Sequence, residues 1–231
     1  MFFVKPIAQN INYHNFADGR MYFSIPNFWN VISNIPYFIF GGAGIIFLLK
    51  ERNNPIYKKS LLSYFVFFAG TFFIAFGSAY YHAWPNNETL VWDRLPMTVA
   101  FMGFFSAMIG DFINERNGKI FLLPLVIFGA FSVLYWQYTE HQGRGDLRLY
   151  GLVQFLPMLL VPLIVVFFRT KNTQTKYLWL LMLAYLAAKF LEAGDELIFK
   201  NSPLLSGHTL KHFSASLAPL FFLLALRTRK V

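Results

Sequence analysis

The sequence has no cysteine and few charged residues. Without cysteine it has no disulfides and no thiolate metal ligands, so histidine, aspartate or glutamate would have to hold any metal. Charged residues make up 13% of the 231 residues, whereas a soluble domain has roughly 25%. Hydrophobic residues make up 56%, and the mean hydropathy is +0.46. This composition could not cover a soluble surface, and it indicates that a lipid bilayer is the surrounding solvent.

Seven segments are long and apolar enough to cross a bilayer, which takes about 20 mostly apolar residues. The predicted spans are residues 28–49, 61–84, 95–112, 120–136, 149–168, 177–199 and 208–226. The connections are too short to hold a soluble domain. We therefore predict an all-α, polytopic membrane protein with seven transmembrane helices, in which residues 1–231 form one domain.

The net charge of +9 would suggest a nucleic-acid partner in a soluble protein. In a membrane protein, short basic loops set the orientation instead, and we expect no nucleic-acid partner. Twelve Lys and Arg residues lie on one side, in segments 50–59, 114–119, 169–176 and 227–230. Seven lie on the other side, namely Lys5, Arg20, Arg94, Arg144, Arg148, Lys200 and Lys211. This bias predicts a cytoplasmic C-terminus and an outer N-terminus, in a membrane that the sequence does not specify.

Polar side chains at a spacing of four residues lie at the ends of two predicted spans. The second span ends with Ser78 and His82, and the seventh opens with His208 and His212. Residues i and i+4 share one helix face, and two histidines so spaced can bind one metal ion. Asp93 precedes the third span in a short loop. The topology places all five residues near one membrane face, the outer one by the charge count.

These residue types fit metal-assisted hydrolysis. Three histidines and a water make a catalytic zinc site with one open position, and such an ion activates water and polarises a carbonyl. Asp93 is then a candidate general base, and Ser78 a candidate donor to the developing oxyanion. Simpler interpretations exist, because all five histidines of the chain, including His14 and His141, lie toward this side and can face interfacial water. Ser78 can serve helix packing, and Asp93 can cap a helix.

The predicted sixth span carries four further charged residues: Lys189, Glu192, Asp195 and Glu196. Glu192 and Asp195 are three residues apart and could face the same site. The simpler interpretation, which we favour, is a pair between Lys189 and Glu192 within the membrane, with the other acids at the interface. Asp111 and Glu115 lie at the cytoplasmic end of the third span and are expected to face water.

Three stretches resemble the motifs of a known family. The sequence FGSAYYH at 76–82, followed by DRLPM at 93–97, resembles the central motif of the alkaline ceramidases. The sequence GHTLKH at 207–212 resembles the family's second histidine motif. The residues NFWN at 27–30, with Ser33 and Asn34, are similar to the family's start of the first span. These stretches occur in the family's order, so the resemblance covers nearly the whole chain.

The resemblance implies an integral-membrane, metal-dependent amidohydrolase that cleaves the amide bond of ceramide-like N-acyl lipids. Carried over by position, it implies zinc on His82, His208 and His212, with Ser78 and Asp93 assisting hydrolysis. The wider superfamily of seven-helix membrane proteins also leaves open a receptor or regulator with a structural zinc site. A transporter that uses the polar groups as a proton path is a third possibility.

Two positions depart from the family pattern. Eukaryotic members bind calcium through an acid-rich segment before the first span, whereas residues 15–27 contain one acid, Asp18. A calcium site is therefore doubtful here. Arg94 stands where the family often has an acid. This difference makes hydrolysis of a lipid amide a firmer expectation than ceramide itself as the substrate.

Overall fold

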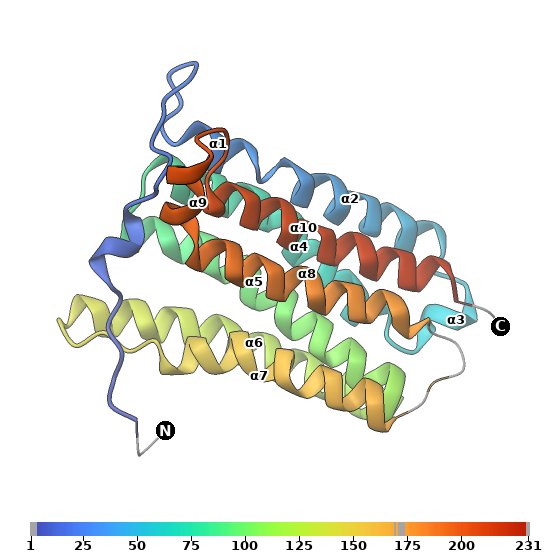
Figure 1. Ribbon diagram of the computed structural model, residues 1–231. Coiled ribbons are helices and arrows are strands. Elements are labelled where there is room, and N and C mark those ends of the chain that lie inside the picture. Colours follow the sequence, from blue (N-terminus) through green and yellow to red (C-terminus); the bar gives the residue numbers. More distant parts are fainter. Residues whose placement is uncertain (1–3, 169, 171–173, 230–231) are drawn as a thin grey trace.

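The computed structural model describes residues 4–168, 170 and 174–229, which form a bundle of helices running up and down (Figure 1). No β-strand occurs in these ranges. The α-helices are α1 (Phe28–Ile32), α2 (Ile35–Lys50), α3 (Pro55–Lys58), α4 (Leu61–Ala83), α5 (Asn87–Met108), α6 (Glu115–His141), α7 (Arg148–Phe167), α8 (Thr175–Ala193), α9 (Asp195–Asn201) and α10 (Gly207–Arg227). A 3-10 helix, η1 (Ile11–His14), precedes the bundle, and a π-helical turn, η2 (Ile109–Ile113), extends α5.

The bundle has the length and surface of a membrane protein. Within the described ranges, six helical spans are long and apolar enough to cross a bilayer, and the bent pair of α8 and α9 makes a seventh if counted as one span. Large apolar side chains cover their outer faces, among them Leu123, Leu159 and Phe190, which are 66%, 67% and 71% exposed. Apolar surface of this extent suits lipid rather than water. The prediction of an all-α, polytopic membrane protein is confirmed.

Helices α4 and α5 pack backbone to backbone. A Cβ atom at Gly77 would lie 1.9 Å from the carbonyl oxygen of Trp92, and one at Gly103 would lie 2.7 Å from the amide nitrogen of Phe67. Small residues allow such close approach between helices in a membrane. The contact at Gly77 matters for function, because it brings the neighbouring Ser78 up against α5.

Helix α5 begins at Asn87 rather than at residue 95. The side chain of Asn86 accepts hydrogen bonds from the backbone N–H groups of Glu88 and Thr89. In return, the Thr89 hydroxyl accepts a hydrogen bond from the backbone N–H of Asn86, which completes a capping box. Asp93 therefore lies inside the helix, and its predicted place in a loop was wrong. Hydropathy missed these first turns because they are polar. Helix α6, at 115–141, likewise exceeds its predicted range of 120–136.

The predicted sixth span is broken rather than continuous. Helix α8 ends at Ala193, and α9 leaves at an angle of 73° after Gly194. The side chain of Asp195 accepts one hydrogen bond from the backbone of His208 and another from Ala17. These bonds tie the start of α9 to neighbouring segments, so α9 folds across the end of the bundle beside the start of α10 (Figure 1).

Asp111 at the opposite end of the bundle is buried, contrary to its predicted exposure. Its side chain is 4% exposed and forms an ion pair with Arg229. It also accepts hydrogen bonds from Tyr64, at 2.5 Å, and Ser60, at 2.8 Å. Glu115, with a side chain 44% exposed, faces solvent as predicted. The buried ion pair joins the chain after α10 to α4 and η2.

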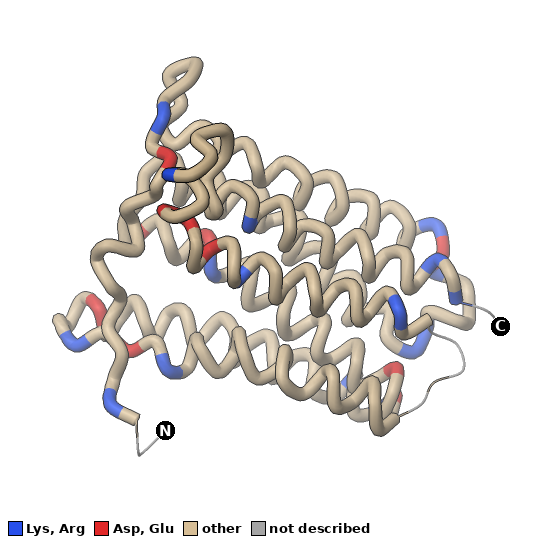
Figure 2. Tube along the Cα trace, in the orientation of Figure 1, with Lys and Arg blue, Asp and Glu red and all other residues tan. Residues whose placement is uncertain are grey.

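Charged residues gather at both ends of the bundle (Figure 2). Of the basic residues counted for orientation, Arg169, Lys171 and Lys230 lie outside the described residues. Two of the others are withdrawn from the surface: Arg94 on α5 is 5% exposed, and the side chain of Lys211 on α10 is 18% exposed. The orientation of the termini stays a prediction.

Candidate active site

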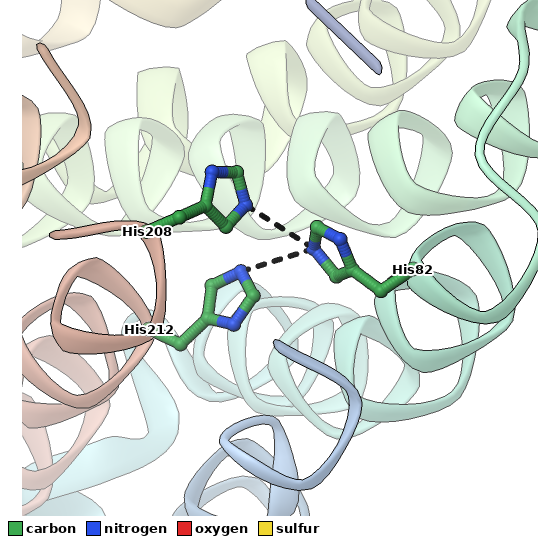
Figure 3. Close-up of side chains that lie close together, drawn as sticks. All are labelled: His82, His208 and His212. Carbon is green, nitrogen blue, oxygen red and sulfur yellow. Dashed lines mark hydrogen bonds between the residues drawn. The ribbon is translucent and has the colours of Figure 1, made fainter. Parts of the chain in front are cut away.

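Three histidines from two helices converge on one point (Figure 3). His82 comes from the last turn of α4, and His208 and His212 come from the first turns of α10. The Nε2 atom of His82 lies 3.2 Å from that of His212 and 3.4 Å from that of His208. All three side chains are buried, and their ligand atoms lie within 4.8 Å of one another. The clustering that the sequence predicted for these residues is thus observed.

The cluster fits a metal ion. Zinc–nitrogen bonds of 2.0–2.1 Å in a tetrahedral site separate two ligand nitrogens by roughly 3.3 Å, close to both measured separations. A ring nitrogen of neutral histidine either donates or accepts one hydrogen bond, yet the Nε2 atom of His82 faces two others. A shared cation would use all three lone pairs. Three imidazoles suit a transition-metal ion better than calcium or magnesium, which prefer oxygen ligands.

Side chains around the cluster orient two of the histidines. Ser33, at the break between α1 and α2, lies 2.7 Å from the Nδ1 atom of His212. Asp195 accepts a hydrogen bond of 2.7 Å from the backbone N–H of His208, which fixes the start of α10. The Nδ1 atom of His82 is buried and has no hydrogen-bond partner in the described part of the chain. Hydrogen-bond partners such as Ser33 and Asp195 hold metal-binding histidines in place.

Lys211 and Glu192 reach the cluster from one side. The Nζ atom of Lys211 lies 3.0 Å from the Nε2 atom of His208 and 2.9 Å from a carboxylate oxygen of Glu192. Lys189 donates to the other oxygen of Glu192 at 2.8 Å. The predicted pair of Lys189 with Glu192 is therefore present, and Glu192 also faces the site through Lys211. Sequence analysis did not assign Lys211 to the site, although its position three residues after His208 was a signal.

Ser78 and Asp93 share the wall of a cavity with His212. The cavity has a volume of about 760 Å³. Ser78 on α4 and Asp93 on α5 both line this cavity, and both residues are buried. The structure thus places a carboxylate and a hydroxyl together on the wall of a cavity that one of the clustered histidines also lines.

Most of the cavity wall is apolar. Ile74, Met97 and Phe101 line its interior. Leu152 and Phe155 on α7 also line it, yet they are 41% and 49% exposed on the lipid-facing surface of the bundle. Ligand pockets of roughly 300–1,000 Å³ hold drug-sized molecules. This cavity can therefore hold part of a lipid chain, and its wall continues to the lipid-facing surface at α7.

The segment before α1 crosses the end of the bundle that holds the three histidines (Figure 1). Its Tyr13 lines the cavity and donates a hydrogen bond to Glu192. Burial, assisted by the charge of Glu192, raises the pKa of Tyr13 well above its ordinary value, so this hydroxyl remains a donor at neutral pH. His14 contacts the hydroxyl of Tyr81 and the side chain of Asn87, each at 3.0 Å. His14 therefore anchors this segment to α4 and α5.

A helical membrane bundle with three buried histidines beside a largely apolar cavity defines a candidate membrane-embedded metalloenzyme. A family model described as Ceramidase matches residues 20–193, and the chain belongs to the ceramidase family. Family membership implies an amidohydrolase. A search of curated proteins gave no match. His208 and His212 lie beyond the matched residues, so the fold rather than the family match brings them to His82.

Proposed function

We propose that the protein is a zinc-dependent membrane hydrolase that cleaves the amide bond of ceramide-like N-acyl lipids. The observation that carries this proposal is the convergence of His82, His208 and His212 beside a cavity that Ser78 and Asp93 line. Family membership supports the amidohydrolase activity. The apolar wall favours a substrate with a long hydrocarbon chain.

Each polar residue has a role in this proposal. The histidines hold the zinc ion, which when bound would activate water and polarise the amide carbonyl. Asp93 accepts a proton from the water as oxygen bonds to the carbonyl carbon, and it passes that proton to the amine as the carbon–nitrogen bond breaks. Ser78 donates a hydrogen bond to the developing oxyanion. The products are a fatty acid and an amine.

A receptor or regulator with a structural metal site is the alternative. Structural zinc sites are usually closed by four protein ligands, whereas catalytic sites have three and keep one position open. Among the described residues, the cluster contains three metal-binding side chains. This count favours the enzyme, and the adjoining cavity gives the reacting amide a place to bind.

Two variants test the assigned roles. Asp93→Asn keeps the shape of the side chain but cannot accept the proton, and Ser78→Ala removes one hydroxyl. A general base contributes typically 10²–10⁴-fold in rate, and an oxyanion donor on the order of 10²–10³-fold. We expect each variant to lose at least about a hundredfold in kcat on a lipid amide while it keeps its zinc and its melting temperature.

The measurement pairs turnover with metal content of the same preparation. Loss of zinc together with activity would make the residue a support of the metal rather than a catalytic group. Near-wild-type turnover in both variants would refute the catalytic assignment.

A further inference from the structure

Arg94 is a buried cation that forms no ion pair with an acidic residue in the described part of the chain. Its side chain lines the cavity, and the residue is 5% exposed. The Nη2 atom donates a hydrogen bond of 2.6 Å to the side-chain oxygen of Gln9, a neutral group. The Nη1 atom is buried and has no partner in the described ranges. Within these ranges no carboxylate oxygen lies within 4.0 Å of the guanidinium.

Aromatic rings hold this guanidinium in place. Its central carbon lies 4.2 Å from the ring centroid of Trp136 and 4.6 Å from that of Tyr150. Tyr13 lies farther away, at 5.8 Å. Stacking on aromatic faces orients an arginine and shields it from water. A shielded cation attracts an anion more strongly than a solvated one does, so Arg94 is prepared to bind a negative group.

Before any metal ion is counted, the side chains around the cavity leave one positive charge in excess. The lining contains four cations, Arg94, Arg148, Lys189 and Lys211, and two carboxylates, Asp93 and Glu192. Arg148 forms an ion pair with Asp146, which is outside the lining. The two lysines share Glu192. Arg94 is the lining cation that lacks an ion pair among the described residues, so it has a positive charge available for an anionic group of a ligand.

We propose that Arg94 binds a carboxylate on the head group of the substrate, so that the preferred lipid is an N-acyl amino acid. The identity of the scissile bond rests on the proposed function, whereas anion binding at Arg94 does not. Asp93 and Arg94 are consecutive on α5, and one residue advances a helix by only 1.5 Å. Both residues also line the same cavity, so a ligand with its amide at Asp93 and its anion at Arg94 would have a short head group. In an N-acyl amino acid the carboxylate is separated from the amide nitrogen by a single carbon.

Binding tests this inference independently of hydrolysis. The probes are octadecanesulfonyl derivatives of glycine and of ethanolamine, in which an uncleavable sulfonamide replaces the amide. They differ in carrying a carboxylate or a hydroxyl. Affinities are measured with the full-length, zinc-loaded protein in a non-ionic detergent. Because charge-assisted hydrogen bonds are roughly twice as strong as neutral ones, we expect wild type to bind the glycine derivative at least about tenfold more tightly.

Substitution of Arg94 separates ligand binding from a purely structural role. We expect Arg94→Gln to bind both probes equally within about threefold, with unchanged affinity for the ethanolamine derivative, and Arg94→Lys to keep part of the preference. Arg148→Gln is the matched control, because this cavity arginine already has an acidic partner, and it should keep the full preference. If Arg94→Gln lowered the affinity for both probes to the same extent, the role of Arg94 would be structural and the proposal would be overturned.

Equal affinity of wild type for the two probes would overturn the proposal without any variant. Hydrolysis of N-oleoylglycine and N-oleoylethanolamide, measured as kcat/KM, separates this inference from the proposed function. Cleavage of both amides at equal kcat/KM would support the amidase and refute the carboxylate preference. Cleavage of neither amide, nor of ceramide or lipid amides with other head groups, would refute the amidase and, with the binding preference intact, leave anion binding at Arg94 standing.

Discussion

The Nε2 atoms of His82 and His212 lie 3.2 Å apart, although 130 positions separate the two residues in the sequence. The contact joins the end of α4 to the start of α10 (Figure 3). Three buried imidazoles at such distances would leave polar nitrogens facing one another, which is costly without a shared partner. A metal ion is the partner that this geometry fits, and the proposed hydrolysis requires that ion.

Ser33 is predicted to support metal binding through His212. Its hydroxyl lies 2.7 Å from the Nδ1 atom of His212, and loss of such a partner typically lowers metal affinity 10- to 100-fold. We expect this loss in Ser33→Ala, measured by competition with a zinc-binding dye. Ser216→Ala on α10 is the control, because its hydroxyl bonds to the backbone of Phe213. Equal zinc affinity in the two variants would show that Ser33 does not support the site.

Gly77 is predicted to set the distance between α4 and α5. A Cβ atom there would lie 1.9 Å from the carbonyl oxygen of Trp92, and backbone atoms cannot move aside without separating the helices. Overpacking of this kind costs about 1–3 kcal/mol. We expect Gly77→Ala to have a lower Tm in detergent and a lower kcat, because the separation also moves Ser78 away from Asp93.

Gly151 on α7 offers a matched control for that substitution. A Cβ atom at Gly151 would meet nothing within 4 Å, and alanine is the better helix former. Gly151→Ala should therefore keep or raise the Tm. If Gly77→Ala melted at the same temperature as Gly151→Ala, the close packing of α4 and α5 at this position would be wrong.

The C-terminus is predicted to be cytoplasmic. Twelve basic residues lie on that side and seven on the other. Arg94, Arg148 and Lys211 of these seven lie in helices and line the cavity, so four remain outside it, namely Lys5, Arg20, Arg144 and Lys200. A reporter that is active only in the cytoplasm should give a signal when fused after Val231. A signal from a reporter active only outside would reverse the orientation and place the histidines at the inner face.

The clustering of the histidines could be predicted from sequence because it depends on two simple rules. Residues four apart share a helix face, and successive spans alternate in direction. His208 and His212 therefore had to lie together, and the end of the second span had to lie at the same membrane face. The positions of the spans could also be predicted, because lipid-facing helices need long apolar stretches that a hydropathy pattern detects.

Features that depend on tertiary contacts could not be predicted. Helix α5 starts at Asn87, before the predicted residue 95, because Asn86 caps its first turns. These turns are polar, so the hydropathy pattern predicts a loop there. The bend after Gly194 accompanies hydrogen bonds from Asp195 to segments distant in sequence. Arg94 was noted in the sequence as a departure from the family pattern. Its aromatic neighbours come from three other segments, so its setting appears only in the fold.

The most direct test of the account is the hydrolysis of an N-acyl lipid by the purified protein, measured together with its zinc content. We expect about one zinc ion per chain, loss of hydrolysis on chelation and recovery when zinc returns. His212→Ala should contain much less zinc and remain inactive, because two histidine ligands are left. Full activity in the metal-free protein, or zinc-loaded wild type that cleaves no lipid amide across a broad range of head groups, would contradict the account.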